Sequence, residues 1–158
     1  MNELNELKLQ LKEEQEKVKK LEQMILEITS PIIQSIIPQT ILVPIVGNLH
    51  TRRIENIIEK LLHYSSLHDV DAIIIDFSAI KKDDIEEVVA FGKYIDHLTG
   101  ALSIVGLDVY YVGFTPEITK ILIQSGLSVS KDIKTFLSFN QALKWLMKVK
   151  GLEFKENT

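Results

Sequence analysis

The chain has 158 residues, of which 46% are hydrophobic and 25% charged, and its formal net charge is −4. This length suits one globular domain with an appendage, and the apolar content is sufficient for one core. Because the chain is acidic and has no basic stripe, nucleic acid is not an expected partner. The lack of cysteine excludes disulfides, thiolate metal sites and a cysteine nucleophile.

The sequence carries no recognisable export signal or membrane anchor. Its first residues are charged, without the apolar segment of a secretory signal. No apolar run approaches the roughly 20 residues that a membrane-spanning helix needs. We therefore expect no membrane partner and a cytoplasmic location.

The first 28 residues follow a heptad pattern, with Glu14 as the only polar residue at an a or d position. The apolar residues at these positions are Leu4, Leu7, Leu11, Val18, Leu21, Ile25 and Ile28. In a parallel dimer, Lys17 at a g position would pair with Glu22 at the following e position of the second copy. The pattern predicts a coiled-coil linker helix over residues 1–30 that makes a homodimer. The alternative is an amphipathic helix folded back onto its own domain.

Strands and helices alternate after Pro31, which ends the first helix because proline lacks an N–H donor and restricts the residue before it. Strands are predicted over about 32–37, 41–46, 72–77 and 108–112. Helices are predicted over about 51–64 and 83–103, from 115 to the residue before Gly126, and from 138 to about 150. Near-continuous apolar strands between helices indicate an α/β fold with a sheet of four or five strands covered by about four helices.

Helix signals refine these boundaries. Thr115 and the proline after it form an N-terminal cap, and Gly126 fits the position just past the end of that helix. Ser138 and Gln141 form a capping box for the last helix. In the helix over 83–103 the inward residues are predicted to be Ile85, Val88, Val89, Ile95 and Leu98. The tail 151–158 is polar and expected to be disordered.

Two loops carry small polar residues where a buried strand leads into a helix: residues 47–51 (GNLHT) and 77–79 (FSA). A strand end that meets a helix start exposes backbone N–H groups and the positive end of the helix dipole. Such a place suits an anion or a phosphorylated side chain. This pattern favours a regulatory docking domain over an enzyme.

Three segments resemble motifs of the STAS domains found in stressosome co-antagonists of the bacterial general stress response. They are residues 44–53 (PIVGNLHTRR), residues 76–80 (DFSAI) followed by Asp84, and Gly106 with 113–118 (GFTPEI) and 126–127 (GL). The resemblance extends from about residue 27 to 146. It implies a STAS domain with a mixed sheet over residues 31–150.

The resemblance also implies a function and partners. Members of that family are non-catalytic scaffolds and antagonists that bind a serine/threonine switch kinase, an anti-sigma factor or other STAS proteins. A helical linker joins their STAS domain to a sensory domain, which we do not expect in this chain. The chain would then be either a piece of a longer protein or a short paralogue.

Site residues follow from the resemblance position by position. Thr51 matches a phospho-acceptor of the family, although His50 and Arg52 depart from the residues usual around it. The second acceptor position holds Ile85, which cannot be phosphorylated, while the aspartate before it is retained. The predicted partner-binding residues are Ser78, Asp84, Arg52 and Arg53.

Other interpretations of the same residues stay open. Thr51 could serve only as a helix N-cap, and Ser78 and Asp84 only as turn and cap residues. The chain could also be a small-ligand module for a nucleotide or lipid, or a structural subunit that is never phosphorylated. We expect no cofactor, no metal and no enzymatic activity. The four histidines lack ligand spacing, and no phosphate-binding loop or nucleophile elbow occurs.

Overall fold

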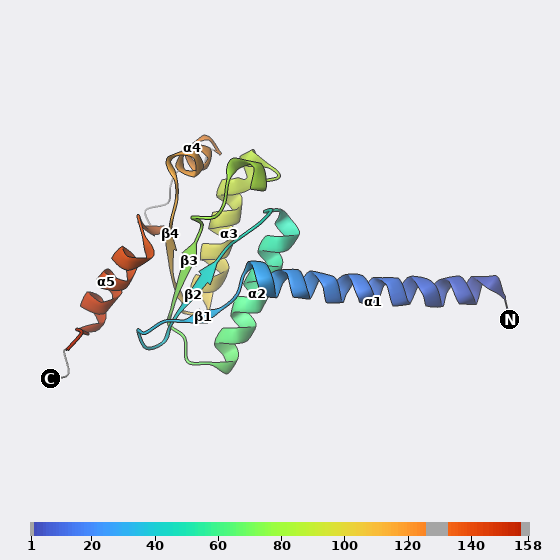
Figure 1. Ribbon diagram of the computed structural model, residues 1–158, viewed down its shortest axis with the longest axis horizontal. Coiled ribbons are helices and arrows are strands. Elements are labelled where there is room, and N and C mark those ends of the chain that lie inside the picture. Colours follow the sequence, from blue (N-terminus) through green and yellow to red (C-terminus); the bar gives the residue numbers. More distant parts are fainter. Residues whose placement is uncertain (1, 126–132, 156–158) are drawn as a thin grey trace.

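The computed structural model describes residues 2–125 and 133–155 (Figure 1). A long N-terminal helix, α1 (Glu3–Thr29), projects from an α/β domain as a rod (Figure 1). It ends just before Pro31, as predicted, with Ser30 as its C-cap. In the described part of the chain, no helix is both long and apolar enough to cross a membrane.

The domain is built on one mixed sheet, as the sequence predicts. Its strands are β1 (Ile33–Gln34), β2 (Thr40–Pro44), β3 (Ala72–Asp76), β4 (Asp108–Val112) and β5 (Lys134–Phe136). They are ordered β1-β2-β3-β4-β5; β1 is antiparallel to β2, and the others are parallel to one another. The carboxyl ends of the four parallel strands therefore meet at one end of the sheet.

Four helices cover this sheet. Helices α2 (Thr51–Leu67) and α3 (Phe91–Ile104) lie on one face, and α5 (Phe139–Lys150) lies on the other (Figure 1). Alternate strand residues point to opposite faces. Accordingly Ile73 and Ile75 join the core beneath α2 and α3, whereas Ile74 packs with Leu146 of α5. Helix α4 (Pro116–Gln124) adds Ile118, Ile121 and Leu122 to the larger core.

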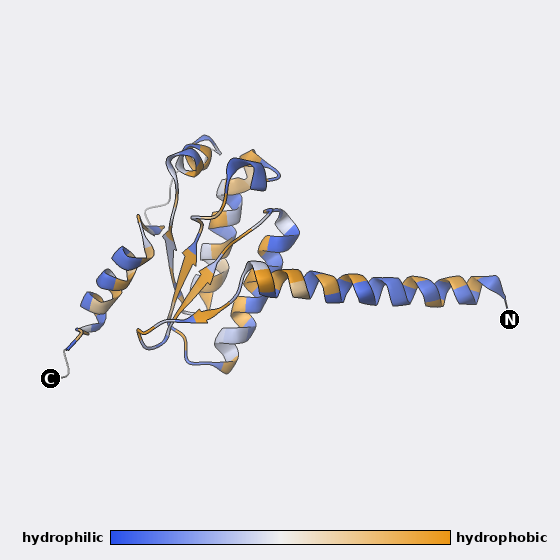
Figure 2. Ribbon diagram, viewed as in Figure 1, coloured by the Kyte–Doolittle hydropathy of each residue, from blue (hydrophilic) through white to orange (hydrophobic). Residues whose placement is uncertain are grey.

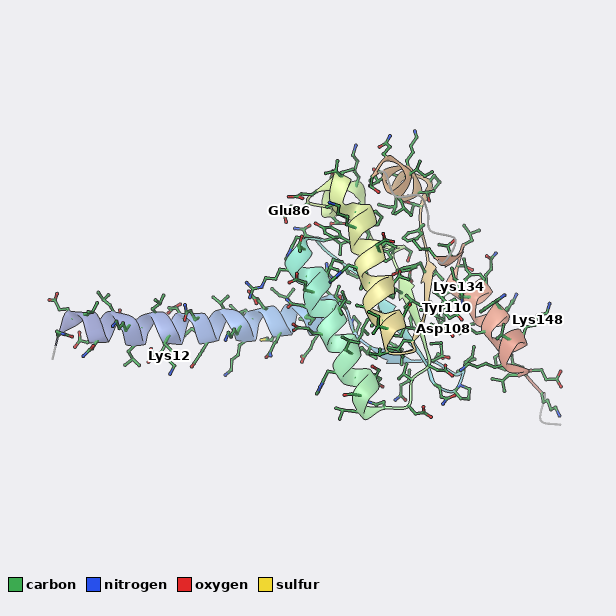
Figure 3. All side chains as sticks on the ribbon, turned by 180° about the vertical axis from the view of Figure 1, so that it is seen from behind. Lys12, Glu86, Asp108, Tyr110, Lys134 and Lys148 are labelled. Atoms are coloured by element: carbon green, nitrogen blue, oxygen red, sulfur yellow. The ribbon has the colours of Figure 1, made fainter. Side chains whose placement is uncertain are left out.

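A polar and aromatic cluster joins β4 and β5 to α5 (Figure 3). The ammonium of Lys134 lies 5.2 Å from the ring centre of Tyr110 and 5.9 Å from that of Trp145. It also lies 3.9 Å from a carboxylate oxygen of Asp108. Burial, together with the carboxylates of Asp108 and Asp71, raises the pKa of Tyr110 to about 12. This cluster lies at the edge of the smaller core between the sheet and α5, which includes Tyr110.

The predicted helix caps are present where the structure describes them. The Thr115 hydroxyl accepts the N–H of Ile118 at 3.2 Å, and that of Ser138 accepts the N–H of Gln141 at 3.3 Å. In a capping box the Gln141 side chain would accept the backbone N–H of Ser138 in return. Here Oε1 of Gln141 instead accepts the N–H of Leu137 at 3.3 Å. The expected role of Gly126 lies outside the described residues.

The helix predicted over 83–103 is wrong in its first two turns. Lys82–Asp84 and Val88–Ala90 are short 3₁₀ turns, and α3 begins only at Phe91. Between the two turns, Ile85 has extended backbone and pairs with Leu49. The backbone here bonds to a neighbouring loop, which overrides the helical spacing of the apolar residues. Val89, predicted to point inward, is 74% exposed.

Three strands are shorter than predicted. The first covers Ile33–Gln34 instead of 32–37, the second covers Thr40–Pro44 instead of 41–46, and the third ends at Asp76 instead of 77. Past Pro44 the chain still follows the sheet for one residue, since Ile45 donates its N–H to the carbonyl of Asp76 at 2.9 Å. The next N–H, that of Val46, goes to the carbonyl of Thr29 at the end of α1. The end of β2 is thereby tied to the base of the rod.

The rod itself is not folded back onto the domain. None of its residues is buried, and its contact with the domain is confined to its last turns beside α2 (Figure 1). The apolar residues of the heptad pattern range from 50% exposed at Val18 to 75% at Ile28. Figure 2 shows apolar residues recurring along the rod far beyond the domain. In a single chain this apolar stripe is uncovered.

Candidate docking site

The loops after β2 and β3 adjoin at the carboxyl end of the sheet. The N–H of Leu49 donates to the carbonyl of Asp84 at 2.6 Å, and the N–H of Glu86 donates back to the carbonyl of Leu49 at 3.1 Å. A short parallel bridge between Leu49 and Ile85 results. It places the start of α2, where Thr51 lies, beside the segment that contains Asp84.

Thr51 is exposed at the first position of α2. It is not the N-cap, so that interpretation is wrong: Nδ1 of His50 accepts the N–H of Arg53 at 3.3 Å and caps the helix. The Thr51 hydroxyl is therefore not needed to start the helix. Thr51 instead lines an open surface hollow, whose other lining residues are His50, Arg52, Glu86, Glu87 and Tyr94.

The charges around Thr51 are mixed. The carboxylates of Glu86 and Glu87 line its hollow, and Glu86 stands at the outer edge of the domain (Figure 3). An adjoining hollow between α2 and α3 adds Glu55 and Lys93. Arg52 is the arginine among the residues that line these two hollows. A phosphate on Thr51 would thus meet both cations and carboxylates.

Arg53, expected at the partner-facing surface, lies inside the domain and is only 7% exposed. Its guanidinium donates to the carbonyl of Asn48 at 2.7 Å, to Oγ of Ser30 at 3.1 Å and to the carbonyl of Thr29 at 3.3 Å. Burial lowers its pKa below the ordinary value, and the nearby carboxylate of Asp84 opposes that shift. Arg53 therefore joins the end of α1 to the loop after β2 instead of offering a cation to a partner.

Arg52, the next residue toward Thr51, faces outward. Its Nη2 lies 2.8 Å from Oε2 of Glu22, two turns before the end of α1. The side chain of Arg52 is 65% exposed and that of Glu22 is 34% exposed. In the described residues this is the ion pair that connects the rod to the domain.

Ser78 lies in the turn just after β3, beside the residue that follows β4. Its N–H donates to Oδ1 of Asp76 at 2.8 Å, and the residue is exposed. Gly113 packs against this turn with φ of +78°, and a Cβ there would stand 2.6 Å from the nitrogen of Ser78. Only glycine fits such a conformation and so close an approach. The segment that follows β4 thereby packs directly on the Ser78 turn.

Asp84 and Ile85 are both tied into the domain. Asp84 is half-buried, and its Oδ2 accepts the N–H of Lys81 at 2.8 Å. Ile85 is 4% exposed and belongs to the core. The position that holds the second acceptor in the resembled family is thus an inward core position in this chain.

Sequence reasoning missed the two arginine contacts with the rod. The relevant signal is the pair Arg52-Arg53 in the first turn of a helix, where cations oppose the helix dipole and therefore need anionic or carbonyl partners. Ser30 gives no such signal in the sequence, because its burial, 1% exposed, is seen only in the fold. The arginine pair by itself does not identify the partners.

Two of the four histidines have local structural contacts. His50 caps α2, and His68 stacks on Tyr64 with ring centres 4.0 Å apart. The described ranges contain no group of three or more histidine, aspartate or glutamate side chains placed to hold a metal ion.

The order of elements and the mixed sheet are those of the STAS fold. The chain is 33% identical over 124 residues to the RsbT co-antagonist protein RsbRB of Bacillus subtilis (strain 168). That match covers 78% of this chain and 42% of RsbRB, so the chain spans less than half the length of this curated relative. The chain has the STAS fold and resembles the stressosome co-antagonists in sequence. No protein-family model matches it.

Solved structures share the fold. An RsbS variant from Moorella thermoacetica matches with a TM-score of 0.61 and 20% identity, over 78% of this chain and 98% of that one. A chain from a structure described as the molecular architecture of the stressosome, a signal integration and transduction hub, matches with a TM-score of 0.62 and 21% identity. That match covers 76% of this chain and 98% of the other. At these identities the likeness concerns the fold.

Proposed function

We propose that this chain is a non-catalytic regulatory scaffold of cytoplasmic stress signalling, which dimerises through α1 and docks a serine/threonine switch kinase or an anti-sigma factor. The observation that carries the proposal is the likeness to RsbRB over 78% of the chain, since that protein is named as a co-antagonist of RsbT. Assembly with other STAS proteins is part of the proposal, supported by the fold shared with a stressosome chain.

The proposed docking surface is the carboxyl end of the sheet around Thr51. Its exposed side chains come from the start of α2, from the turn at Ser78 and from the segment that carries Glu86 and Glu87. Backbone bonds join the loop before α2 to the segment of Asp84 and Glu86, and the Ser78 turn is held by the carboxylate of Asp76, so the surface is ordered before a partner arrives. A preformed surface lowers the ordering cost of binding. Arg52 is the arginine of this surface, since Arg53 is buried.

Thr51 is the proposed phosphorylation site. A kinase would transfer the γ-phosphoryl group of ATP to Oγ of Thr51, which loses its proton, and ADP would leave. The product adds about −1.5 to −2 charges. The fold would tolerate them, because Thr51 is exposed and stands at the positive end of a helix dipole. The partner would then meet an anion where it had met a hydroxyl.

Dimerisation through α1 is supported by its uncovered apolar stripe. A helix of 27 residues without one buried residue gains little from its own domain. Most helices in proteins are stabilised by packing of an apolar face. A second copy in parallel would cover the a and d positions and bring both docking surfaces to one end of the rod.

One of the alternatives gains an observation. A structural subunit that is never phosphorylated is favoured by Ile85, because that position is both aliphatic and buried in the core. The small-ligand interpretation has less support, since the hollows at Thr51 are open and lined by charged residues. Ligand sites are usually enclosed and mostly apolar.

The test uses the full chain, a cognate switch kinase and ATP. We expect the kinase to bind the unmodified chain and mass spectrometry to find one phosphate, on Thr51. Thr51→Ala should abolish the modification, whereas Thr135→Ala, a matched change of an exposed threonine on β5, should not. Kinase binding without phosphate on Thr51 would favour the structural subunit, and absence of kinase binding would refute the docking proposal.

A further inference from the structure

The rod meets the domain at a hinge with two kinds of contact. At the base, Ser30 leaves the helical conformation with φ of −144° and ψ of 60°. Arg53 and Lys60 hold this point, Arg53 through Thr29 and Ser30, and Lys60 through the carbonyl of Ser30 at 2.9 Å. Burial lowers the pKa of Lys60, and the carboxylate of Glu27 opposes the shift. These contacts fix where the rod begins.

A lateral contact between rod and domain lies further out along the helix. The pair between Glu22 and Arg52 stands two turns along α1 from the hinge, where a lateral contact has leverage on the angle of the helix. Arg52 lines two hollows at once. One is formed with Thr51, Glu86 and Glu87, and the other with the side of α1 that carries Glu22. One guanidinium thus stands between the docking site and the rod.

We propose that a phosphate on Thr51 and the carboxylate of Glu22 compete for the guanidinium of Arg52, so that phosphorylation releases the rod from its fixed angle. This inference rests on the proposed phosphorylation of Thr51. It adds what the modification would do inside the chain, whereas the proposed function concerns what it does to a partner.

Charge and position favour the phosphate in this competition. A phosphate carries up to two charges against one on Glu22, and it accepts bidentate bonds from a guanidinium. Within its hollow it would also face Glu86 and Glu87, whose repulsion makes a cation necessary there. The present pair between Arg52 and Glu22 is weakly held, because both side chains reach water.

Release of Glu22 would also affect the dimer. Glu22 is an e position of the heptad pattern, opposite Lys17 at a g position of a second copy. While Arg52 binds the carboxylate of Glu22, Lys17 of the second copy has to share that carboxylate with Arg52. Once Arg52 turns to a phosphate, Glu22 is free to pair across the coil. Modification of the domain would thereby strengthen the coil and loosen its attachment.

The test measures the distance between rod and domain by pulsed electron spin resonance. The chain has no cysteine, so Lys12→Cys on the rod and Lys148→Cys on α5 give two defined labels on opposite parts of the molecule (Figure 3). Labelled chains diluted with unlabelled ones report distances within one chain. Phosphothreonine is installed at position 51 by ligation of a synthetic segment, so that no kinase is needed.

We expect a narrow distance distribution in the unmodified chain, and a broader, shifted one with phosphothreonine at position 51. Glu22→Gln and Arg52→Gln should broaden it without phosphate. Glu16→Gln, a matched change of an exposed rod residue outside the ion pairs of the described residues, should leave it narrow. In Arg52→Gln the phosphate should add nothing further.

Two results would overturn the inference: an unchanged narrow distribution in the phosphorylated chain, or additional broadening by phosphate in Arg52→Gln. The installed phosphate separates this test from the proposed function. A kinase that never modifies Thr51 refutes the proposed phosphorylation while the competition for Arg52 can still be observed.

Discussion

The rod and the domain contain the same apolar residue types in opposite surroundings. Leu61 and Leu98 of the domain are fully buried, whereas Leu11 of the rod is 61% exposed. In the domain, leucine is covered by the sheet and neighbouring helices of its own chain. In the rod, a similar content of leucine and isoleucine stays mostly uncovered, and only Leu26 near its end packs against the core of the domain. The apolar residues of the domain are therefore covered within one chain, whereas most of those of the rod are left for another molecule to cover, as the proposed dimer would.

The largest expected effect comes from the same substitution made in both regions. Leu98→Ala should lower the free energy of unfolding of the domain by about 2–5 kcal/mol, because it leaves a cavity in a closed core. Leu11→Ala should leave the unfolding of the domain unchanged and weaken self-association instead. Denaturant unfolding followed by near-ultraviolet signals, run beside sedimentation, separates the two effects. If Leu11→Ala lowered the stability of the domain as much as Leu98→Ala does, the rod and the domain would not differ in how their leucines are covered.

A second prediction concerns the close packing of Gly113 against the Ser78 turn, at the carboxyl end of the sheet. Gly113→Ala should destabilise it by about 2–4 kcal/mol, because a positive φ is strained for alanine and the added Cβ meets the Ser78 backbone. The control is Gly100→Ala in α3, where a Cβ meets nothing within 4 Å. That change should stabilise by about 0.5–1 kcal/mol, since alanine favours helix. Similar melting temperatures for both variants would contradict the packing described for Gly113.

The smallest expected effect lies where domain and docking surface meet, at Asp84. Asp84→Ala should cost about 1 kcal/mol, because the N–H of Lys81 loses its acceptor and the buried Arg53 loses a nearby anion. Asp84→Asn keeps an acceptor and should cost less. Both variants should weaken kinase binding if the charge of Asp84 contributes to the contact with the partner. Full kinase affinity in Asp84→Asn would assign Asp84 a structural role only.

Much of the architecture could be predicted from local patterns. Residue spacing predicts the apolar sheet and the four helices that cover it. Cap residues and proline chemistry predict the cap at Thr115 and the end of the first helix before Pro31. These features depend on neighbours in sequence. The exposed apolar stripe of the rod agrees with the heptad pattern, since that pattern leaves such a stripe for another helix.

The errors arise where distant segments decide the outcome. Ile85, Val88 and Val89 have spacing compatible with a helix, yet a bridge to Leu49 draws Ile85 into extended backbone. No local signal announces such a bridge. In the candidate site, Thr51 was correctly placed at the start of α2, but the cap proved to be His50. A histidine can cap a helix only when its ring is turned toward the free N–H groups, which the sequence does not specify.

Burial of charge was the hardest property to predict. Arg52 and Arg53 are adjacent and chemically identical, and the sequence predicts both as partner-binding residues. One side chain of such a pair points about 100° away from the other around a helix. Here that rotation sends Arg53 into the base of the rod and leaves Arg52 at the docking site. The choice depends on where Ser30 and Asn48 lie in three dimensions.

Sedimentation equilibrium of the full chain tests the central distinction between rod and domain most directly. At micromolar concentration we expect a dimer, and Glu14→Leu should tighten it by at least about tenfold, because a like-charged pair leaves the seam and apolar packing replaces it. A control change at Glu16, which lies off the seam, should have no such effect. A monomer throughout the concentration range, unaffected by Glu14→Leu, would contradict the assignment of α1 as a dimerising rod.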